Sequence, residues 1–478
     1  MGLTWVAFLL RVPGLAGQSL WRDEVDSLYF AGWELRLLLE QLTATGHNGP
    51  LYYLLLRPWL QLTGATEFAL RYPSALMGTL AVPLGYTLVR QLGLSRRAGL
   101  LLSLLLATSP YLVWYSQEGK MYTLLLVVVM LAVIAHTRAL AGEGARWWGV
   151  FVLATTLSFY LHILAPMMLP VYGAAALIFF SQTRRRWRGW LASMACLTLP
   201  YLPLVIWQAS MFRAGVSQGH PFYPFKQQFS LLLQLYSGGL IKFAGPTGLV
   251  LVVFLLLAGL FLVNPRARAE AYTLRRRLLL AAWLLLPPLA IYLISLRVPV
   301  FEDRYVIYIT PAFYLLLALG LILIRHHARW LAGLCLGLLL ALNLLGIWQQ
   351  QRQPINADFR AAAAYLAQQP TRPQAIIIQI PYLKRTFDYY YRAEYKFLEG
   401  LWTNGGKPPA EVDRDMLGLT AGLPEVWLVV SEEASWDSRQ LMRSWLNQHA
   451  SLADEAHFMR VDVYHYRFAS GNIDASAN

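Results

Sequence analysis

An acidic pair near the start of the chain carries the first chemical signal. Asp23 and Glu24 follow an apolar run and come directly after Trp21 and Arg22. Adjacent carboxylates at the end of a membrane span can serve as a general base or as ligands of a divalent metal ion. The alternative is the solvated start of a loop. The spacing alone leaves both interpretations open.

Further polar residues stand at the ends of apolar runs. Glu118 and Lys120 lie between two such runs, Arg11 lies inside the first run, and His162 lies near the end of another. Three more clusters follow the same pattern: His47 to Pro50, Arg71 to Ser74, and Glu302 to Tyr305. Charged side chains near or within membrane spans are energetically costly, so each is a candidate for function. The alternatives are a polar hairpin tip for Glu118 with Lys120, and ordinary packing for His162.

Membrane-spanning helices are needed to position these clusters. The chain is 57% hydrophobic and only 14% charged, whereas soluble domains carry about 25% charged residues. Apolar runs of about 20 residues, enough to cross a bilayer, recur along the first three quarters. The sequence therefore predicts a polytopic α-helical membrane protein. The eleven predicted spans are 3–19, 68–91, 97–113, 119–138, 147–164, 165–182, 189–207, 246–263, 278–296, 305–324 and 329–348.

The positive charge predicts an orientation for these spans. The net charge is +14, and arginines gather in alternate connectors, a pattern typical of cytoplasmic loops. These connectors are Arg90 with Arg96 and Arg97, Arg138 with Arg146, Arg184 to Arg188, Arg266 to Arg277, and Arg325 with Arg329. We therefore expect a multi-pass protein of the plasma (inner) membrane, in contact with membrane lipids and with no nucleic-acid partner.

Two regions outside the spans have their own predicted structure. Residues 20–67 contain amphipathic stretches at 33–42 and 51–62, whose aromatic residues favour helices along the outer membrane surface. We divide the chain into a transmembrane catalytic domain, 1–350, and a small extracytoplasmic α/β domain, 351–478. Within the second domain we predict helices at 358–368 and 435–449 and strands at 375–380, 426–430 and 459–468.

The predicted topology places all the polar clusters on one face of the membrane. Carboxylates and cations then meet at one depth on the extracytoplasmic side, whereas the cytoplasmic side carries arginine and little acid. This arrangement suits a reaction on a phosphorylated lipid at the membrane surface.

Several motifs, in this order, resemble a known family. They are Ser19-Leu-Trp-Arg-Asp-Glu24, His47 with Pro50-Leu-Tyr-Tyr, Arg71-Tyr-Pro-Ser74, Tyr115-Ser-Gln-Glu118 and Phe159-Tyr-Leu-His162. Over about residues 5–325 the chain resembles bacterial relatives of the dolichyl-phosphate-mannose–protein mannosyltransferases, a group that includes the lipid A aminoarabinose transferase. The resemblance implies the GT-C fold, a polyprenyl-phosphate sugar donor and inversion at the anomeric carbon.

The resemblance also implies roles for single residues. Asp23 matches the catalytic acidic residue of the family and Glu24 its neighbour, while Glu118 matches a later acidic position. Arg11 and Arg71 match basic positions. At Lys120 relatives commonly carry arginine, and lysine keeps the charge but loses bidentate phosphate geometry.

These roles combine into one predicted mechanism. Asp23 removes the proton of the acceptor hydroxyl as it attacks the anomeric carbon, through an oxocarbenium-like state. The leaving phosphate gains charge and needs cations. Glu24 and Glu118 complete the predicted catalytic set. The predicted donor-binding set is Arg11, His47, Tyr52, Arg71, Lys120, His162, Arg304 and Tyr305.

Several alternatives remain open at this point. The acceptor is a lipid, a glycan or a protein; no cofactor is required by the pattern, although paired carboxylates would suit a divalent metal. A lipid or sugar transporter or flippase would need polar residues along a path through the midplane. A non-catalytic glycan-binding membrane protein would not need the acidic pair.

Overall fold

A computed structural model describes the whole chain except residues 43–47, 215–219, 241–244, 263–273 and 470–478. The described chain divides into two compact units. Unit 1 comprises residues 1–15 and 30–352, and unit 2 comprises residues 16–29 and 353–478. The segment that carries Asp23 and Glu24 therefore belongs to the same unit as the C-terminal region.

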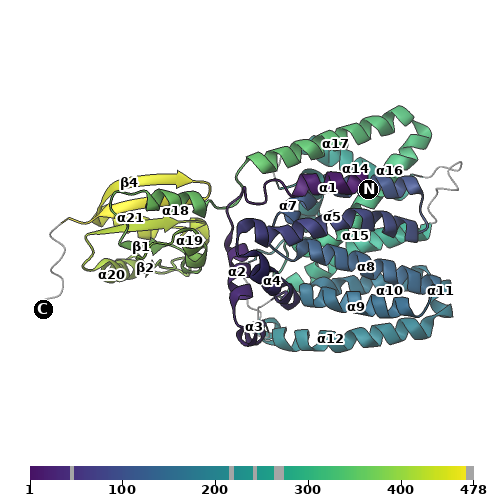
Figure 1. Cartoon of the computed structure of the whole chain (residues 1–478), viewed down its shortest axis with the longest axis horizontal. Coiled ribbons are helices and arrows are strands. Elements are labelled where there is room, and N and C mark those ends of the chain that lie inside the picture. Colours follow the sequence, from purple (N-terminus) through teal and green to yellow (C-terminus); the bar gives the residue numbers. More distant parts are fainter. Residues whose placement is uncertain (43–47, 215–219, 241–244, 263–273, 470–478) are drawn as a thin grey trace. The chain divides into compact units, whose positions relative to one another are not determined.

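Unit 1 is built from helices, whose longest members run side by side (Figure 1). They are α1 (Gly2–Arg11), α3 (Leu35–Leu42), α4 (Pro50–Thr63), α5 (Glu67–Gln91), α6 (Arg96–Thr108), α7 (Pro110–Ser116), α8 (Tyr122–Ala141), α9 (Arg146–Leu161), α10 (Leu169–Ile178), α11 (Phe180–Arg185), α12 (Trp187–Ala214), α13 (Phe225–Gly238), α14 (Gly245–Phe261), α15 (Leu274–Ser295), α16 (Thr310–His327) and α17 (Arg329–Arg352). The short 3-10 helices η1 (Ala165–Met168) and η3 (Asp303–Ile309) precede α10 and α16.

The chain is a helical multi-span membrane protein, as the sequence predicts. Within the described residues, five helices are long and apolar enough to cross a membrane, or six if the bent pair α6 and α7 is one span. Each of the eleven predicted ranges contains helix, but several helices are short, such as α1 and α14. The surface helices predicted at 33–42 and 51–62 correspond to α3 and α4. Helix α13, in a predicted connector, was not anticipated.

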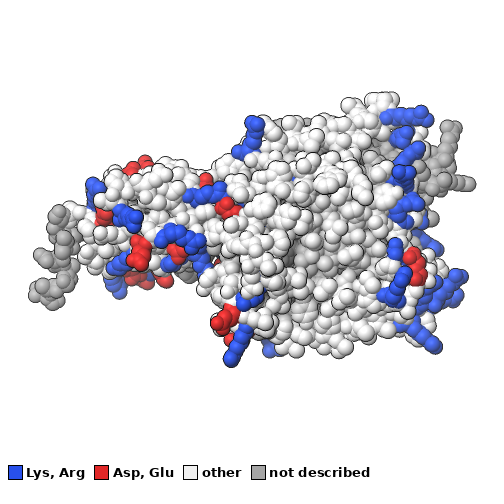
Figure 2. Space-filling view, viewed as in Figure 1, with Lys and Arg blue, Asp and Glu red and all other residues white. Residues whose placement is uncertain are grey.

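Lys and Arg side chains of the described residues gather at one end of unit 1. Figure 2 shows them at that end, while the face of the helical bundle in view is almost without charge. Helix α5 ends at this basic end and begins with Glu67 at the other, and α8 runs the same way. The opposite end, which carries α3 and α4 (Figure 1), is called the polar end below.

Helix α16 lies at the centre of unit 1, and its apolar segment is buried along its whole length. It packs closely on α14 through two glycines. A Cβ at Gly259 would stand 2.3 Å from the Leu316 carbonyl oxygen, and a Cβ at Gly320 would stand 2.2 Å from that of Leu255. Small residues at such crossings let helix backbones approach within a membrane.

Unit 2 contains a five-stranded sheet in the order β2-β1-β3-β5-β4. Its strands are β1 (Ala375–Ile378), β2 (Lys396–Glu399), β3 (Glu425–Val430), β4 (Ser451–Phe458) and β5 (Val461–Arg467). Strands β2, β1 and β3 are parallel, whereas β5 is antiparallel to both β3 and β4. The predicted α/β domain thus contains a mixed sheet. The predicted ranges agree with three of its strands, β1, β3 and β5, and with its helices α18 (Phe359–Ala367) and α21 (Leu441–His449).

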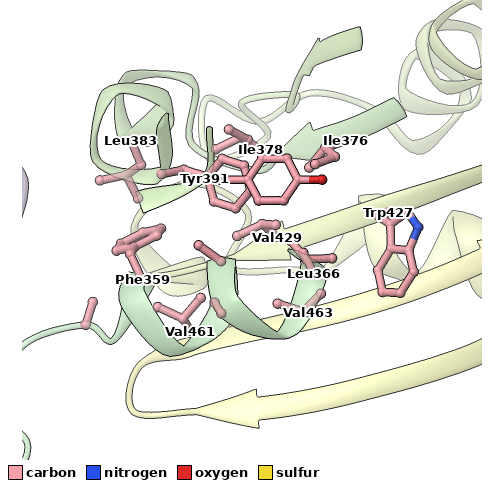
Figure 3. Close-up of a cluster of buried hydrophobic side chains, with 14 of the residues drawn as sticks. Phe359, Leu366, Ile376, Ile378, Leu383, Tyr391, Trp427, Val429, Val461 and Val463 are labelled. Atoms are coloured by element: carbon pink, nitrogen blue, oxygen red, sulfur yellow. The ribbon is translucent and has the colours of Figure 1, made fainter. Parts of the chain in front are cut away.

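The sheet carries a hydrophobic core on each face, because neighbouring strand residues point to opposite sides. On one face Ile376 and Ile378 pack with Phe359 of α18 and Phe387 of α19 (Lys384–Tyr390), as in Figure 3. On the other face, α20 (Pro409–Thr420) and α21 cover Ile377 and Leu428. The helices that follow β1 and β2 therefore lie on opposite faces.

Candidate functional site

The acidic pair lies at the start of helix α2 (Arg22–Gly32), where no helix was predicted. Glu24 is fully buried, and its Oε2 accepts a hydrogen bond from the Trp21 backbone N–H at 3.4 Å. This contact is the returning half of a capping box, in which the third helical residue satisfies a terminal N–H. Glu24 therefore has a structural contact at the start of the helix, and its catalytic role stays a prediction.

Asp23 lies in a different environment from its neighbour. Its side chain keeps 21% exposure and forms an ion pair with Arg22 at 3.0 Å. Its backbone carbonyl accepts a hydrogen bond from the Ser27 hydroxyl. Of the two predicted carboxylates, Asp23 is the more exposed, and its part in catalysis stays a prediction.

Helix α2 is anchored within unit 2 by several contacts. Asp26 pairs with Arg385 at 3.4 Å, and the Arg385 guanidinium lies 4.1 Å from the centre of the Tyr29 ring. The Arg22 guanidinium lies 5.0 Å from the centre of the Tyr382 ring. These contacts connect the helix that carries Asp23 to the C-terminal sheet domain.

At the polar end of unit 1, the loop between α7 and α8 is joined to α5. The Ser74 hydroxyl donates to the Lys120 carbonyl at 3.0 Å, and the Thr123 hydroxyl donates to the Ser74 carbonyl at 2.9 Å. A Cβ at Gly119 would stand 2.3 Å from Leu70 Cγ, so the loop fits against α5 only with glycine there. The structure thus brings together two of the predicted clusters.

The charged side chains of these two clusters are held individually. Glu118 is buried, and its Oε1 accepts from the Trp114 indole N–H at 2.9 Å. The buried Lys120 ammonium lies 3.5 Å from the Tyr53 hydroxyl. Arg71 is also buried and donates to the Leu15 carbonyl at 2.8 Å. The predicted Tyr52 is buried beside Tyr53, with ring centres 5.6 Å apart.

His162 lies between two tyrosine rings at the polar end. It is fully buried at the end of α9, and its ring centre lies 4.6 Å from that of Tyr305 and 6.5 Å from that of Tyr122. The Arg304 guanidinium lies 5.5 Å from the centre of the same Tyr305 ring. His162 Nδ1 accepts from the Leu164 backbone N–H at 3.1 Å, so Nε2 carries the proton of the neutral ring. Among the described residues this buried Nε2–H has no acceptor.

The loop before α16 contributes groups that the predicted site did not include. The Tyr115 hydroxyl donates to Asp303 Oδ2 at 2.8 Å. Glu302 pairs with Arg304 at 3.5 Å and with His220 at 3.1 Å. The Glu302–Tyr305 cluster pointed to these acids, whereas nothing in the local sequence distinguished His220 within its long connector.

Arg11 is joined to the backbone rather than to these groups. It is fully buried, and its guanidinium donates to the carbonyls of Ala7, Leu106 and Ala107 and to the Ser116 hydroxyl. Two of these acceptors, the carbonyls of Leu106 and Ala107, lie at the end of α6 beside its 58° bend into α7, where the chain leaves helical carbonyls without intrahelical partners. Stabilisation of the bend accounts for this buried charge, and donor binding by Arg11 stays a prediction.

The predicted His47 lies outside the described residues. Its neighbour Asn48 is described, and the Asn48 side-chain oxygen accepts from the Ile163 backbone N–H at 2.8 Å. The segment that follows His47 is therefore fixed next to the segment that carries His162.

The remaining candidates are a metal site and a cavity. The described part of the chain contains no group of three His, Cys, Asp or Glu side chains arranged to hold a metal ion. A cavity of about 160 Å³ lies at the basic end, among Gln91, His136, Tyr172 and Arg276. It is far along α5 and α8 from the loop of Glu118 and Lys120, so we assign it no catalytic part.

Comparison with known proteins confirms the resemblance seen in the motifs. Residues 47–207 match the family model described as dolichyl-phosphate-mannose-protein mannosyltransferase. This region contains Arg71, Glu118, Lys120 and His162. None of the curated proteins compared with the chain matches it.

The fold is similar to that of two solved membrane proteins. ArnT from Cupriavidus metallidurans, bound to undecaprenyl phosphate, aligns over 97% of this chain and 97% of its own, with a TM-score of 0.59 and 14% identity. The oligosaccharyltransferase AglB from Archaeoglobus fulgidus, in complex with an inhibitory peptide and a dolichol-phosphate, aligns over 99% of this chain and 75% of its own. Its TM-score is 0.50 and its identity 12%. At these identities the similarity establishes the fold alone.

Proposed function

We propose that this chain, whose residues 47–207 match the dolichyl-phosphate-mannose-protein mannosyltransferase family, is an inverting glycosyltransferase. It transfers a sugar from a polyprenyl-phosphate donor to an acceptor hydroxyl. The two similar folds were solved with undecaprenyl phosphate and with dolichol-phosphate as their bound lipids, which supports a donor of the same chemical class.

The grouping of His162 with Arg304 and the loop of Lys120 is the observation that carries the proposal. The His162 ring lies 4.6 Å from the Tyr305 ring, and the Arg304 guanidinium lies 5.5 Å from the centre of that same ring. Lys120 lies two residues before Tyr122, whose ring lies 6.5 Å from that of His162. The His162 Nε2–H has no acceptor among the described residues.

Two cations and one donor of this kind suit a phosphate group, because its oxygens accept hydrogen bonds from all three. The lipid phosphate is a diester in the donor and a monoester in the product, so it gains negative charge as the sugar leaves. Cations stabilise that charge most strongly in a site with little water.

Asp23 is the proposed base. It takes the proton of the acceptor hydroxyl, the acceptor oxygen bonds to the anomeric carbon, and the bond from that carbon to the phosphate oxygen breaks. Attack on the face opposite the phosphate inverts the anomeric carbon. Glu24 is buried in its helix cap, and Glu118 is held by the Trp114 indole. We therefore propose that these two acids position the machinery and do not transfer the proton.

A transfer assay on the purified chain in lipid tests the mechanism. With a polyprenyl-phosphate sugar as donor, Asp23→Asn should lower turnover by a factor on the order of 10²–10⁴, the usual contribution of a general base. Donor affinity should change little, because the lipid and the phosphate contacts are retained. Glu24→Gln is the matched control and should retain most turnover. Near-normal turnover in Asp23→Asn would remove Asp23 from the mechanism, and lipid movement without cleavage of the sugar would indicate a flippase.

We propose further that the polar end faces away from the cytoplasm. The basic connectors support this orientation. In a functional chain with single introduced cysteines, an impermeant thiol reagent added to intact cells should label a cysteine at position 404, in unit 2, and not one at position 185, in a basic connector. The reverse labelling pattern would contradict the orientation.

A further inference from the structure

The parallel part of the unit 2 sheet has the topology of a ligand-binding edge. The chain runs from β1 to β2 on one side and then returns past β1 to β3 on the other. The connecting helices lie on opposite faces, α19 on one and α20 on the other. In open sheets of this kind, ligands bind outside the carboxyl ends of the strands, at the point where the strand order reverses.

Three aromatic side chains stand at that edge. Tyr382 follows β1, Trp402 follows β2 and Trp436 follows β3. The ring centres of Tyr382 and Trp436 are 5.7 Å apart, and those of Trp402 and Trp436 are 6.4 Å apart. Tyr382 is 43% exposed and Trp402 55% exposed. We call these three residues the aromatic platform.

The aromatic platform is held in place by the loops beneath it. The Thr403 hydroxyl donates to Asp437 Oδ1 at 2.5 Å, and its N–H donates to the Trp436 carbonyl at 3.1 Å. The Asn404 side chain accepts from the Ser438 backbone N–H at 2.9 Å. Such ties keep two large apolar rings exposed in a fixed position, so a ligand loses little binding energy to ordering the site.

A buried polar group with unused hydrogen-bonding capacity lies at the same edge of the sheet as the platform. Gln379, directly after β1, is 1% exposed, and its Oε1 has no donor among the described residues. Its amide nitrogen lies 3.5 Å from Glu433 Oε1. Buried polar atoms in native proteins normally have partners, so an exception at a ligand-binding edge indicates a hydrogen-bonding ligand.

Three carboxylates near the platform are each paired with an arginine. Glu432 pairs with Arg460 at 3.3 Å, Glu433 with Arg443 at 3.5 Å, and Asp23 with Arg22 at 3.0 Å. A strongly anionic or cationic ligand would gain little from such a surface. A neutral saccharide suits it, because the C–H face of a sugar ring packs on aromatic rings and its hydroxyls bond to polar groups at the edge.

We infer that the aromatic platform binds a neutral oligosaccharide, which forms part of the acceptor. The inference rests on the proposed function and names the acceptor class that the sequence left open. Its physical link to the reaction is Arg22, which contacts the Tyr382 ring and the Asp23 carboxylate. A saccharide on the platform therefore lies one side chain away from the proposed base.

Saccharide binding to the full chain in lipid nanodiscs, without donor, tests the inference. The probes are hexasaccharides of mannose, glucose and arabinose, and saturation-transfer NMR gives the affinities. At least one probe should bind, and Trp402→Ala and Tyr382→Ala should each weaken it by about tenfold or more. Leu452→Ala is the control. Leu452 is also exposed, but it pairs with Tyr466, which lies beside the start of β3, whereas the platform follows the ends of the strands. Undecaprenyl-phosphate binding should be unchanged in all three variants.

Two results would overturn the inference. One is the absence of binding by every probe, or binding that neither platform variant weakens. The other is a smaller quenching of tryptophan fluorescence by brominated lipids in Trp402→Phe than in the wild type, which has 17 tryptophans; this would place the Trp402 ring in the membrane surface. Because no donor is present, the assay is independent of turnover. A chain that binds saccharide here and never cleaves a polyprenyl-phosphate sugar would refute the proposed function and not the binding site.

Discussion

Cationic side chains at two places in unit 1 have very different partners. Arg11, beside the bend between α6 and α7, is fully buried and donates to three backbone carbonyls and one hydroxyl. At the polar end, the buried Lys120 and the partly exposed Arg304 instead face polar side chains, including a tyrosine hydroxyl and a glutamate. The second place also holds His162, whose buried N–H has no acceptor among the described residues.

The comparison shows that burial of a charge does not by itself mark a functional site. A charge that is buried in protein needs partners, and for Arg11 three backbone carbonyls and a serine hydroxyl supply them. A functional assignment is better supported where a buried donor keeps unused hydrogen-bonding capacity, as His162 does among the described residues. By this criterion the region of Lys120, His162 and Arg304 is the stronger candidate for binding the donor phosphate.

The largest expected effect is at the polar end. Arg304→Met removes one of two cations proposed to stabilise the leaving phosphate, so turnover should fall by about 10²–10³, as for loss of one preorganised donor. Thermal stability should change much less than turnover, because the side chain is joined mainly to other side chains. Transfer rate and melting temperature measured on the same sample decide this. A variant with a clearly lower melting temperature and an unchanged transfer rate per folded molecule would show that Arg304, like Arg11, has a structural role.

Arg11→Met should show the opposite behaviour. It leaves the buried carbonyls of Leu106 and Ala107 without their donor, which should lower the free energy of unfolding by about 3 kcal/mol or more. Donor affinity of the folded fraction should stay within about threefold of the wild type. Thermal unfolding in detergent and a donor-binding titration measure the two quantities. Loss of donor binding at unchanged stability would give Arg11 a direct part in the site.

Gly119→Ala tests whether the α7–α8 loop must lie against α5. The new Cβ would stand 2.3 Å from Leu70 Cγ, so the loop that carries Glu118 and Lys120 has to shift. We expect turnover to fall by about tenfold or more, because displacements of about 1 Å are costly in a catalytic site. Gly173→Ala is the control, since no atom lies within 4 Å of its Cβ position. Equal activities of the two variants would show that the loop position is not critical.

Lys120 should show a smaller, graded response. Lys120→Arg keeps the charge and should retain donor affinity within about threefold, whereas Lys120→Met should lose about tenfold. Donor titration at low and high salt measures both affinities. If charge is responsible, the difference in donor affinity between Lys120→Arg and Lys120→Met should be smaller at high salt. Equal affinities for the two variants would show that the Lys120 charge is not used in donor binding.

The smallest expected effect lies in unit 2, at the exposed pair of His457 and Asp462. The hydrogen bond to Asp462 raises the pKa of His457. A raised pKa in the folded state stabilises the protein below about pH 6.5, the ordinary histidine value, and this contribution is lost as the pH rises through the folded value. His457→Gln should therefore lower stability at pH 5.5 by less than about 1 kcal/mol and have almost no effect at pH 8.5. Thermal unfolding at both pH values checks the sign, and a larger effect at pH 8.5 would contradict it.

The predictions made from the sequence succeeded where one physical constraint dominates. Apolar runs must cross the bilayer and basic connectors must stay outside it. The sequence therefore predicted both the helical membrane class and the collection of basic residues at one end. Strand β4 was missed because nearly all its residues are exposed, which removes the alternation by which strands are recognised. Helix α2 was missed because its first turn is charged and its apolar residues are interrupted by polar ones.

The sequence by itself determined which residues were candidates, because charge beside apolar runs is costly and therefore visible. Only the tertiary structure decided which contacts each candidate makes and how exposed it is. It buried Glu24 at a helix start and left Asp23 partly exposed, joined Arg11 to carbonyls beside a bend, and packed His162 and Arg304 against the same Tyr305 ring. It also assigned residues 16–29 to the unit of the C-terminal sheet. The physical reason is that these outcomes depend on contacts between residues far apart in the chain, which no local pattern records.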